Sequence, residues 1–165
     1  MLTENELIKF RRELHSYPET GWCEFVTTHK IVEKLRSFGL DPIYGRQVIN
    51  PEFVAGRNPA KVEEAKKAAL DKGVPPEFIE SMQDYTGVAA IFETGRPGPV
   101  LAIRFDMDCV DVDEAHEAGH RPFDEGWAST NPGHMHSCGH DGHTTMGIAV
   151  CNWIQENLDQ FCGCL

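Results

Sequence analysis

The sequence predicts an α/β domain, because amphipathic helical segments stand near both ends of the chain and strand-like segments lie between them. Apolar residues recur at helical spacing at both ends, whereas the middle of the chain holds short apolar runs bounded by glycine and proline. The chain has 165 residues, which is long enough to bury one real core. Hydrophobic residues make up 41% of it and charged residues 25%, as in an ordinary folded domain.

The first helix is expected over residues 4–16, where apolar side chains form a stripe. Thr3 and Glu6 have the spacing of a capping box, which starts a helix. Pro18 ends the helix, because the residue before a proline avoids the helical conformation.

A second helix is expected over residues 23–38, again from apolar residues near helical spacing, and Gly39 follows it as a stop signal. Residues 40–50 then look extended, with interruptions at Pro42 and Gly45.

Residues 51–85 differ in composition from the rest and look like a helical insertion rich in Lys, Glu and Ala. Two helices are expected in it, over residues 60–72 and 76–84. The insertion has two interpretations, a lid or partner-binding element and a solvated helical elaboration, of which the second is favoured.

Two strands and a last helix complete the prediction. Residues 86–94 alternate apolar and polar side chains, residues 95–98 form a turn, and residues 99–105 form an apolar run typical of a central strand. We expect the two strands to pair antiparallel across the turn. A helix over residues 144–158 should direct these residues toward the core: Met146, Val150, Trp153, Ile154 and Leu158.

The net charge of −11 argues against nucleic acid or an anionic membrane as the main partner. The amino terminus has charges throughout and no apolar signal core, and no run approaches the length of a membrane span. A cytoplasmic location is therefore expected, and the six cysteines are expected to be reduced thiols.

The most informative segment is residues 134–143, which hold four histidines, one thiol and one carboxylate. A thiolate and an imidazole two residues apart, as at Cys138 and His140, suit zinc or a similar divalent metal. The alternatives are a buried structural cysteine and histidines, or a redox-active thiol. The cluster as a whole favours a metal site that is completed from elsewhere and keeps a position open for water.

Two carboxylates follow the expected strand 99–105. Asp106 and Asp108 lie two residues apart, so both side chains could face the same side at the end of a strand, where the sites of α/β sheets gather. They could ligate a metal or hold the ring of a metal-bound histidine. The alternative is a polar strand end that caps the following loop.

Residues 111–125 form an acidic loop that contains His116 and His120. This histidine spacing would suit zinc on a helix, but Gly119 and Pro122 weaken the helix. A mobile acidic rim is the favoured interpretation.

Taken together, these motifs resemble the aminoacylase and carboxypeptidase-like metallohydrolases, in their subgroup of amidohydrolases with a cysteine ligand. Residues 135–144 read MHSCGHDGHT, residues 11–21 read RRELHSYPETG, and residues 104–108 read RFDMD. Residues 94–99, 120–122 and 126–129 are more specific, and resemble members of this subgroup that cleave aminobenzoyl-glutamate.

The resemblance implies a mixed-sheet, helix-flanked, zinc-peptidase-like catalytic domain that cleaves an amide bond of a small N-acyl amino acid with two manganese or zinc ions. Cys138 and His140 match metal-ligand positions, and Asp108 matches an aspartate that supports the metal site. Asp106 stands where many relatives have a ligand histidine. Further residues are candidates for contacts behind the metal ligands: Asp106, His136, Asp141 and His143. A homodimer or a second hydrolase subunit is an expected partner.

The chain departs from this family in length, because family members are more than twice as long. We therefore expect residues 1–165 to be an incomplete, amino-terminal part of the catalytic domain. The general-base glutamate, the later ligands and the lid or dimerisation domain would be absent, as in a truncated or frameshifted product. The leading hypothesis is a metal-dependent amidohydrolase represented by an inactive fragment. The alternative is a non-catalytic metal-binding or interaction fragment.

Overall fold

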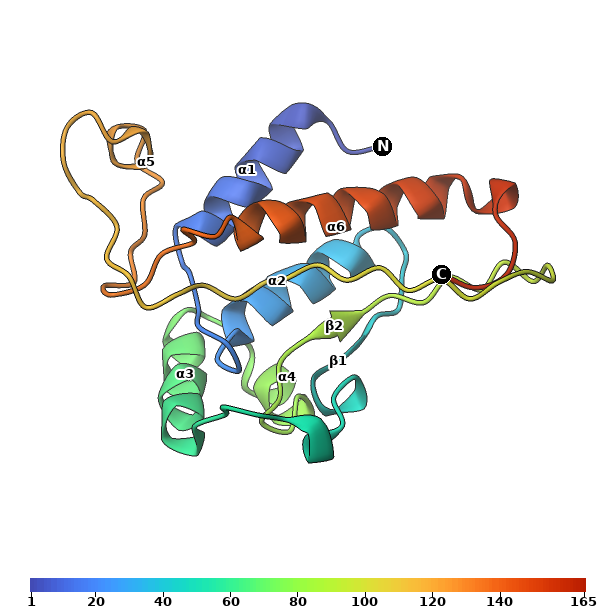
Figure 1. The fold of residues 1–165 in the computed structure, drawn as a ribbon, viewed down its shortest axis with the longest axis horizontal. Helices are drawn as coiled ribbons and strands as arrows, with labels where there is room; N and C mark the ends of the chain where they lie inside the picture. The colour runs from blue at the N-terminus through green and yellow to red at the C-terminus, as the bar shows by residue number, and fades with distance from the viewer.

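The computed structural model describes residues 1–165, and a long helix, α6, lies at its centre with α1 and α2 packed against it (Figure 1). Helix α3 packs against α2, away from α6, and α5 belongs to a loop that projects at one end of the molecule (Figure 1). The helices are α1 (Glu4–His15), α2 (Phe25–Arg36), α3 (Pro59–Asp71), α4 (Pro76–Ser81), α5 (Arg121–Asp124) and α6 (His140–Glu156).

The predicted helices are confirmed, with shifts at their ends. Helix α1 ends one residue before the predicted limit, and α2 begins two residues later than predicted. Helix α6 begins at His140, four residues earlier than predicted. The earlier start follows from Gly139, whose φ of 78° turns the backbone sharply and lets the helix begin inside the histidine-rich segment.

The capping box at α1 is also confirmed. The Thr3 side chain accepts a hydrogen bond from the Glu6 amide at 3.3 Å, and the Glu6 carboxylate accepts one from the Thr3 amide at 2.8 Å. Two backbone donors that a helix start leaves without a partner are thereby satisfied.

Buried apolar side chains form two clusters on either side of α2. The first core cluster lies between α2 and the segment of α3 and α4, and consists of Cys23, Phe25, Val26, Val32, Val62, Ala69, Val74, Phe78, Ile79 and Met82. The second core cluster joins α1, α2 and α6, and consists of Phe10, Leu14, Ile31, Leu35 and Ile148. Residues 51–85 are therefore packed against the body of the protein by an apolar face.

The predicted strand pairing is wrong. Strand β2 (Val88–Ala89) pairs antiparallel with β1 (Ile43–Tyr44), and not with residues 99–105. Carboxyl-terminal residues lie between the two segments that were expected to pair. The Phe92 amide donates to the Leu165 carbonyl at 2.8 Å, and the Leu101 amide donates to the Cys164 carbonyl at 2.9 Å.

The segment 99–108, which we call the open strand, crosses the molecule without forming a strand of a sheet (Figure 1). Its middle is not buried as a central strand would be, since Val100, Leu101 and Ile103 are 82%, 53% and 53% exposed. An apolar run becomes a central strand only if other layers cover it on both faces, and no other part of the chain covers these three side chains.

The open strand is held against α6 at its carboxyl end. A side chain at Gly147 would meet the Phe105 ring at 2.8 Å, so the glycine allows Phe105 to lie directly on the helix. The Thr144 hydroxyl donates to the Asp106 carbonyl at 3.0 Å. These contacts bring residues 105–108 beside the first two turns of α6.

The apolar residues of α6 face two directions. Ile154 is buried as predicted, and so is Ile148, which was not among the predicted core residues, but Met146 and Trp153 are exposed. Their predicted burial is wrong because α1 and α2 cover only part of the helix surface. No helix in the structure combines the length and the apolar character that crossing a bilayer requires.

Candidate metal centre

Three potential metal ligands meet where the open strand passes the start of α6. One ligand atom from each of Asp106, His140 and His143 lies within 4.8 Å of the others. Asp106 Oδ2 is 3.9 Å from His140 Nε2 and 3.8 Å from His143 Nδ1. Residues three apart on a helix share a face, so the first turn of α6 presents both imidazoles to the carboxylate.

Asp108 holds the ring of His140 from the opposite side. His140 Nδ1 lies 2.9 Å from the Asp108 carbonyl and 3.1 Å from its carboxylate, so this nitrogen donates the hydrogen bond. The lone pair of Nε2 is then directed toward Asp106, as in metal-bound histidines whose second nitrogen is fixed by a carboxylate or carbonyl.

The residues suit a divalent metal by the chemistry of their donors. A carboxylate and two imidazoles are ligands for zinc, manganese or similar ions, and three protein ligands leave coordination positions open. Cys138 is exposed on the loop before α6 and is not one of the three clustered residues. Its role as a ligand therefore stays a prediction, whereas the geometry makes Asp106 and His143 candidates for direct ligation.

His136 is a buried imidazole without a hydrogen-bond partner at either ring nitrogen. Burial lowers its pKa to about 4, so the ring is neutral at physiological pH. One nitrogen of a neutral imidazole can donate a hydrogen bond, and the other can accept one or bind a metal. The two free nitrogens of His136 are therefore consistent with a site completed by an ion or by ordered water.

Asp141 fixes the start of α6 to α1. Its Oδ2 accepts from His15 Nδ1 at 2.7 Å and from Arg11 Nε at 2.9 Å, and its side chain is fully buried. Burial alone would raise the pKa of Asp141, but the hydrogen bond from His15 and the charge of Arg11 outweigh it and hold the pKa below its ordinary value. The carboxylate is therefore charged and anchors the first turn of α6, which carries His140 and His143.

Glu114 continues this network into the acidic loop. Its Oε1 lies 3.0 Å from His15 Nε2 and 2.9 Å from His120 Nε2, and its other oxygen accepts from the Ser129 amide. Its side chain has no exposed surface. The interpretation of residues 111–125 as a mobile acidic rim is therefore wrong at Glu114.

The sequence pattern carried no signal for this role of Glu114. It is one of several acidic residues in one loop, and its partner His15 is 99 positions away. The structure also separates His116 from His120, since the ring of His116 stacks on Phe123 while His120 binds Glu114.

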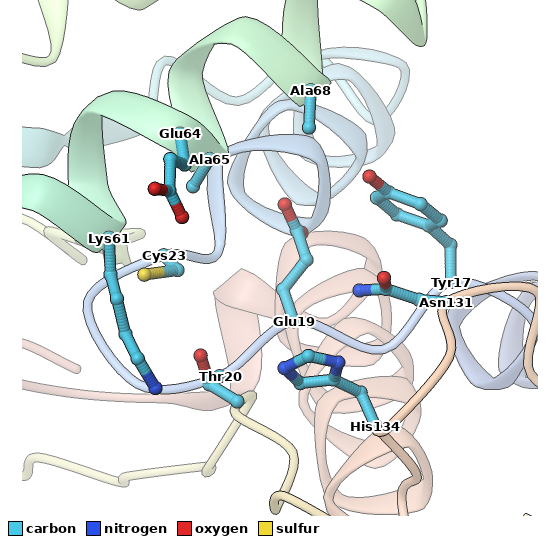
Figure 2. Close-up of a pocket in the computed structure, with 10 residues that line it drawn as sticks. All are labelled: Tyr17, Glu19, Thr20, Cys23, Lys61, Glu64, Ala65, Ala68, Asn131 and His134. Carbon is cyan, nitrogen blue, oxygen red and sulfur yellow. The ribbon is translucent and has the colours of Figure 1, made fainter. Parts of the chain in front are cut away.

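A separate cavity of about 280 Å³ lies between α3 and the loop that precedes α2 (Figure 2). Lys61 and Glu64 line it from α3, and Glu19 and Thr20 line it from the loop. None of the three clustered metal-ligand candidates lines this cavity, so it is not the metal centre. Glu19 instead accepts from two amides at the start of α2 and has a structural role.

Comparison with known proteins relates the chain to one family of hydrolases. Residues 102–163 match the sequence profile of Peptidase family M20/M25/M40. Over 160 residues the chain is 45% identical to a Haemophilus influenzae homolog of a p-aminobenzoyl-glutamate hydrolase subunit. It is 39% identical, also over 160 residues, to indole-3-acetyl-aspartic acid hydrolase of Enterobacter agglomerans. These alignments cover 96% of this chain but only 38% and 37% of the two relatives.

Solved structures agree with this relationship. The chain superposes on an aminobenzoyl-glutamate utilization protein from Klebsiella pneumoniae with a TM-score of 0.71 at 28% identity, covering 97% of this chain and 34% of that one. It superposes on the YXEP protein of Bacillus subtilis, described as a dinuclear metal-binding peptidase of the M20 family, with a TM-score of 0.64 at 26% identity, covering 97% and 33%. The predicted resemblance and fold class are thus confirmed, and the chain spans just over a third of the curated relatives.

Proposed function

We propose that this chain, as a relative of the M20 peptidases, supplies part of the metal centre of an amidohydrolase that cleaves N-acyl amino acids. The observation that carries the proposal is the convergence of Asp106, His140 and His143, with Asp108 holding the His140 ring. When bound, a divalent ion such as manganese or zinc supplies Lewis acidity that polarises the scissile carbonyl and lowers the pKa of the attacking water.

The chain's own residues have distinct parts in this proposal. Asp106, His140 and His143 would hold the ion, with Cys138 as a further candidate and a second ion as the dinuclear relative suggests. Asp108 would keep the His140 Nε2 lone pair directed at the ion.

We propose that the group that takes the proton from water lies outside these residues. Asp106 and Asp108 are committed to the imidazoles, and Glu24 is buried and hydrogen-bonded to Thr86. General-base assistance is typically worth about 10²–10⁴-fold in rate. Residues 1–165 alone are therefore expected to hydrolyse no aminobenzoyl-glutamate above background.

The names of the two relatives favour a narrower substrate class. One relative is named for hydrolysis of aminobenzoyl-glutamate and the other for hydrolysis of indole-3-acetyl-aspartic acid, and both compounds join an aromatic acyl group to an acidic amino acid. We therefore propose an aromatic acyl derivative of glutamate or aspartate as the substrate. The first relative is also named for one subunit of a hydrolase, which supports a different subunit of that hydrolase as the partner.

Metal binding is the direct test of the proposal. The purified chain should retain manganese or zinc in equilibrium dialysis, and the His140→Ala variant should lose most of it. His134→Ala is the matched control, because His134 lies in the same segment but not among the clustered ligands. Equal metal content in the chain and in His140→Ala would contradict the proposal.

Activity tests the catalytic part separately. Release of 4-aminobenzoate and glutamate from aminobenzoyl-glutamate should require both added metal and chain beyond these residues. Substantial metal-dependent turnover by residues 1–165 alone would show that the proton-transfer group has been assigned wrongly.

A further inference from the structure

His15 lies between two carboxylates that come from different parts of the chain. Its Nδ1 is 2.7 Å from Asp141 Oδ2 at the start of α6, and its Nε2 is 3.0 Å from Glu114 Oε1 in the acidic loop. The imidazole side chain is 3% exposed, and neither carboxylate side chain has exposed surface. Because the three groups are shielded from solvent, they must satisfy one another's hydrogen bonds and charges.

Asp141 requires a proton on Nδ1 of His15. A charged carboxylate oxygen can only accept a hydrogen bond, so a ring nitrogen that faces one must donate. The guanidinium of Arg11, whose Nε is 2.9 Å from the same Asp141 oxygen, favours the charged form of this carboxyl.

Glu114 requires a proton on the other ring nitrogen. Its Oε1 lies 2.9 Å from His120 Nε2 as well as beside His15, and its Oε2 accepts from the Ser129 amide. The competing arrangement is a neutral His15 ring beside a protonated Glu114. It is disfavoured because the ordinary pKa of an imidazole, 6.5, lies above that of the carboxyl, 4.5, so the ring holds a shared proton.

The charged groups around His15 agree with a protonated ring. Burial lowers the pKa of His15, and Arg11 of α1 lowers it further. The hydrogen bonds to Asp141 and Glu114 outweigh both effects, and the pKa lies above its ordinary value. The His136 ring, whose centroid is 6.3 Å away, adds no charge, because burial lowers its pKa to about 4.

We propose that His15 is a positioning residue that acts as a buried imidazolium, whose two ring nitrogens donate at once and hold the acidic loop and the start of α6 to α1. A neutral ring could donate to only one of the two carboxylates and would leave the other with a buried charge that lacks this partner. Asp141 would keep Arg11 as a donor. Loss of the ring proton should therefore loosen Glu114, and with it the acidic loop.

Nitrogen-15 NMR of the parent chain tests the protonation directly. Between pH 5 and pH 9, both ring nitrogens of His15 should carry protons below a midpoint that lies above 6.5. Amide exchange gives a second readout. Protection of the Ser129 amide, which donates to Glu114, should fall about tenfold as the ring loses its proton, in line with the net contribution of one hydrogen bond. The Thr130 amide is the matched control, because it donates to the Ser16 carbonyl at 2.8 Å and should keep its protection.

His15→Gln tests the positioning role. Gln can donate to one carboxylate but carries no charge, so protection of the Ser129 amide should be low at every pH. Manganese or zinc should bind about tenfold more weakly than to the parent chain. This metal readout rests on the proposed function, because it concerns the turn that carries His140 and His143. His116→Gln is the matched control, since His116 is exposed in the acidic loop and should match the parent chain in both measurements.

Three results would contradict this role of His15. One is a ring nitrogen without a proton at pH 6, and another is a parallel change in the protection of the Ser129 and Thr130 amides with pH. The third is equal metal affinity of the parent chain and folded His15→Gln. If His15→Gln does not fold, the ring nitrogens and the Ser129 amide of the parent chain decide alone. A parent chain that binds no metal would count against the proposed function only, because neither of these two readouts needs an ion.

Discussion

Asp141 and Glu114 join the metal-facing turn of α6 to two distant segments through a single histidine, His15. Asp141 accepts from one ring nitrogen and Glu114 from the other, and the network ends at His120 in the acidic loop. The positions of His140 and His143 therefore depend on Asp141 and Glu114, although neither carboxylate belongs to the metal-ligand cluster. Side chains that hydrogen-bond to metal ligands, or fix their positions, commonly contribute to metal affinity in this way.

Glu114→Gln is expected to weaken manganese or zinc binding by about tenfold, since such outer contacts are typically worth 10–100-fold. The variant keeps one oxygen for the two histidines, but it loses the negative charge that faces them, and its NH2 group cannot accept from the Ser129 amide. Glu117→Gln removes the same charge from the same loop, at a side chain with no hydrogen bond or ion pair in the structure, and should bind metal normally. Identical dissociation constants for the two folded variants by calorimetry would contradict this expectation.

Glu24 makes stability depend on pH. Burial raises the pKa of its carboxyl to about 7, from an ordinary value of 4.5. The folded state therefore binds the proton more tightly than the unfolded state does. Stability from this group is fully present below pH 4.5 and is lost as the pH rises through 7.

Glu24→Gln should remove this pH dependence, because Gln stays neutral and its carbonyl can still accept from the Thr86 hydroxyl. The variant should gain up to about 3 kcal/mol over the parent chain at pH 8, at roughly 1.4 kcal/mol per pKa unit. The gain should shrink toward zero at pH 4. Urea denaturation across this range measures it, and a gap that does not change with pH would rule out the assigned pKa.

At the residue scale, the structure brings together part of what the sequence singles out. Asp106 and Asp108 lie beside His140 of the histidine-rich segment, whereas a metal-ligand role for Cys138 stays a prediction. The network behind them was not derivable, because His15 meets Asp141 across 126 positions and no local pattern encodes that contact. Whether Asp106 is a metal ligand or supports a metal-bound histidine depends on distances that only the folded structure supplies.

Among the elements, the helices were predictable, whereas the two short strands were predictable in place but not in pairing. A helix satisfies its own backbone, so the capping box and apolar spacing of α1 suffice to locate it. A strand needs a partner, and the pattern of residues 86–94 does not reveal that β2 pairs with β1. The prediction of a central strand over residues 99–105 is wrong, because no other strand pairs with this apolar run and no layer covers it.

The capping box of α1 gives an element-scale prediction. Thr3→Ala should destabilise the protein by about 1 kcal/mol, because the Glu6 amide loses its acceptor. Thr3→Ser retains a hydroxyl and should be close to the parent chain. Free energies of unfolding from denaturant titration decide between these outcomes, and equal losses for Ala and Ser would assign the effect to something other than the cap.

At the scale of the whole molecule, the division of the core into two clusters determines the order in which segments come into contact during folding. The first core cluster uses residues 23–82 only, so its contacts close short loops. The second core cluster needs Ile148 of α6 to meet Phe10 and Leu14 of α1. Contacts of such long sequence separation form late, because the entropy of a large loop must be lost first.

Refolding should therefore proceed in two stages that pulse-labelled hydrogen exchange can separate. Amides of α2 and α3 are expected to gain protection before those of α6. Simultaneous protection of all three helices would contradict this order.

The late docking of α6 has a consequence for the ion. His140 and His143 reach Asp106 only when α6 docks, so an ion bound by these three residues would stabilise the docked position of α6. Ion at 100 times its dissociation constant would add about 2.7 kcal/mol to the docked state. A chelator should then reduce hydrogen-exchange protection at α6 and leave that of α3 unchanged, so that the histidine-rich segment would be ordered by the same ion that it binds.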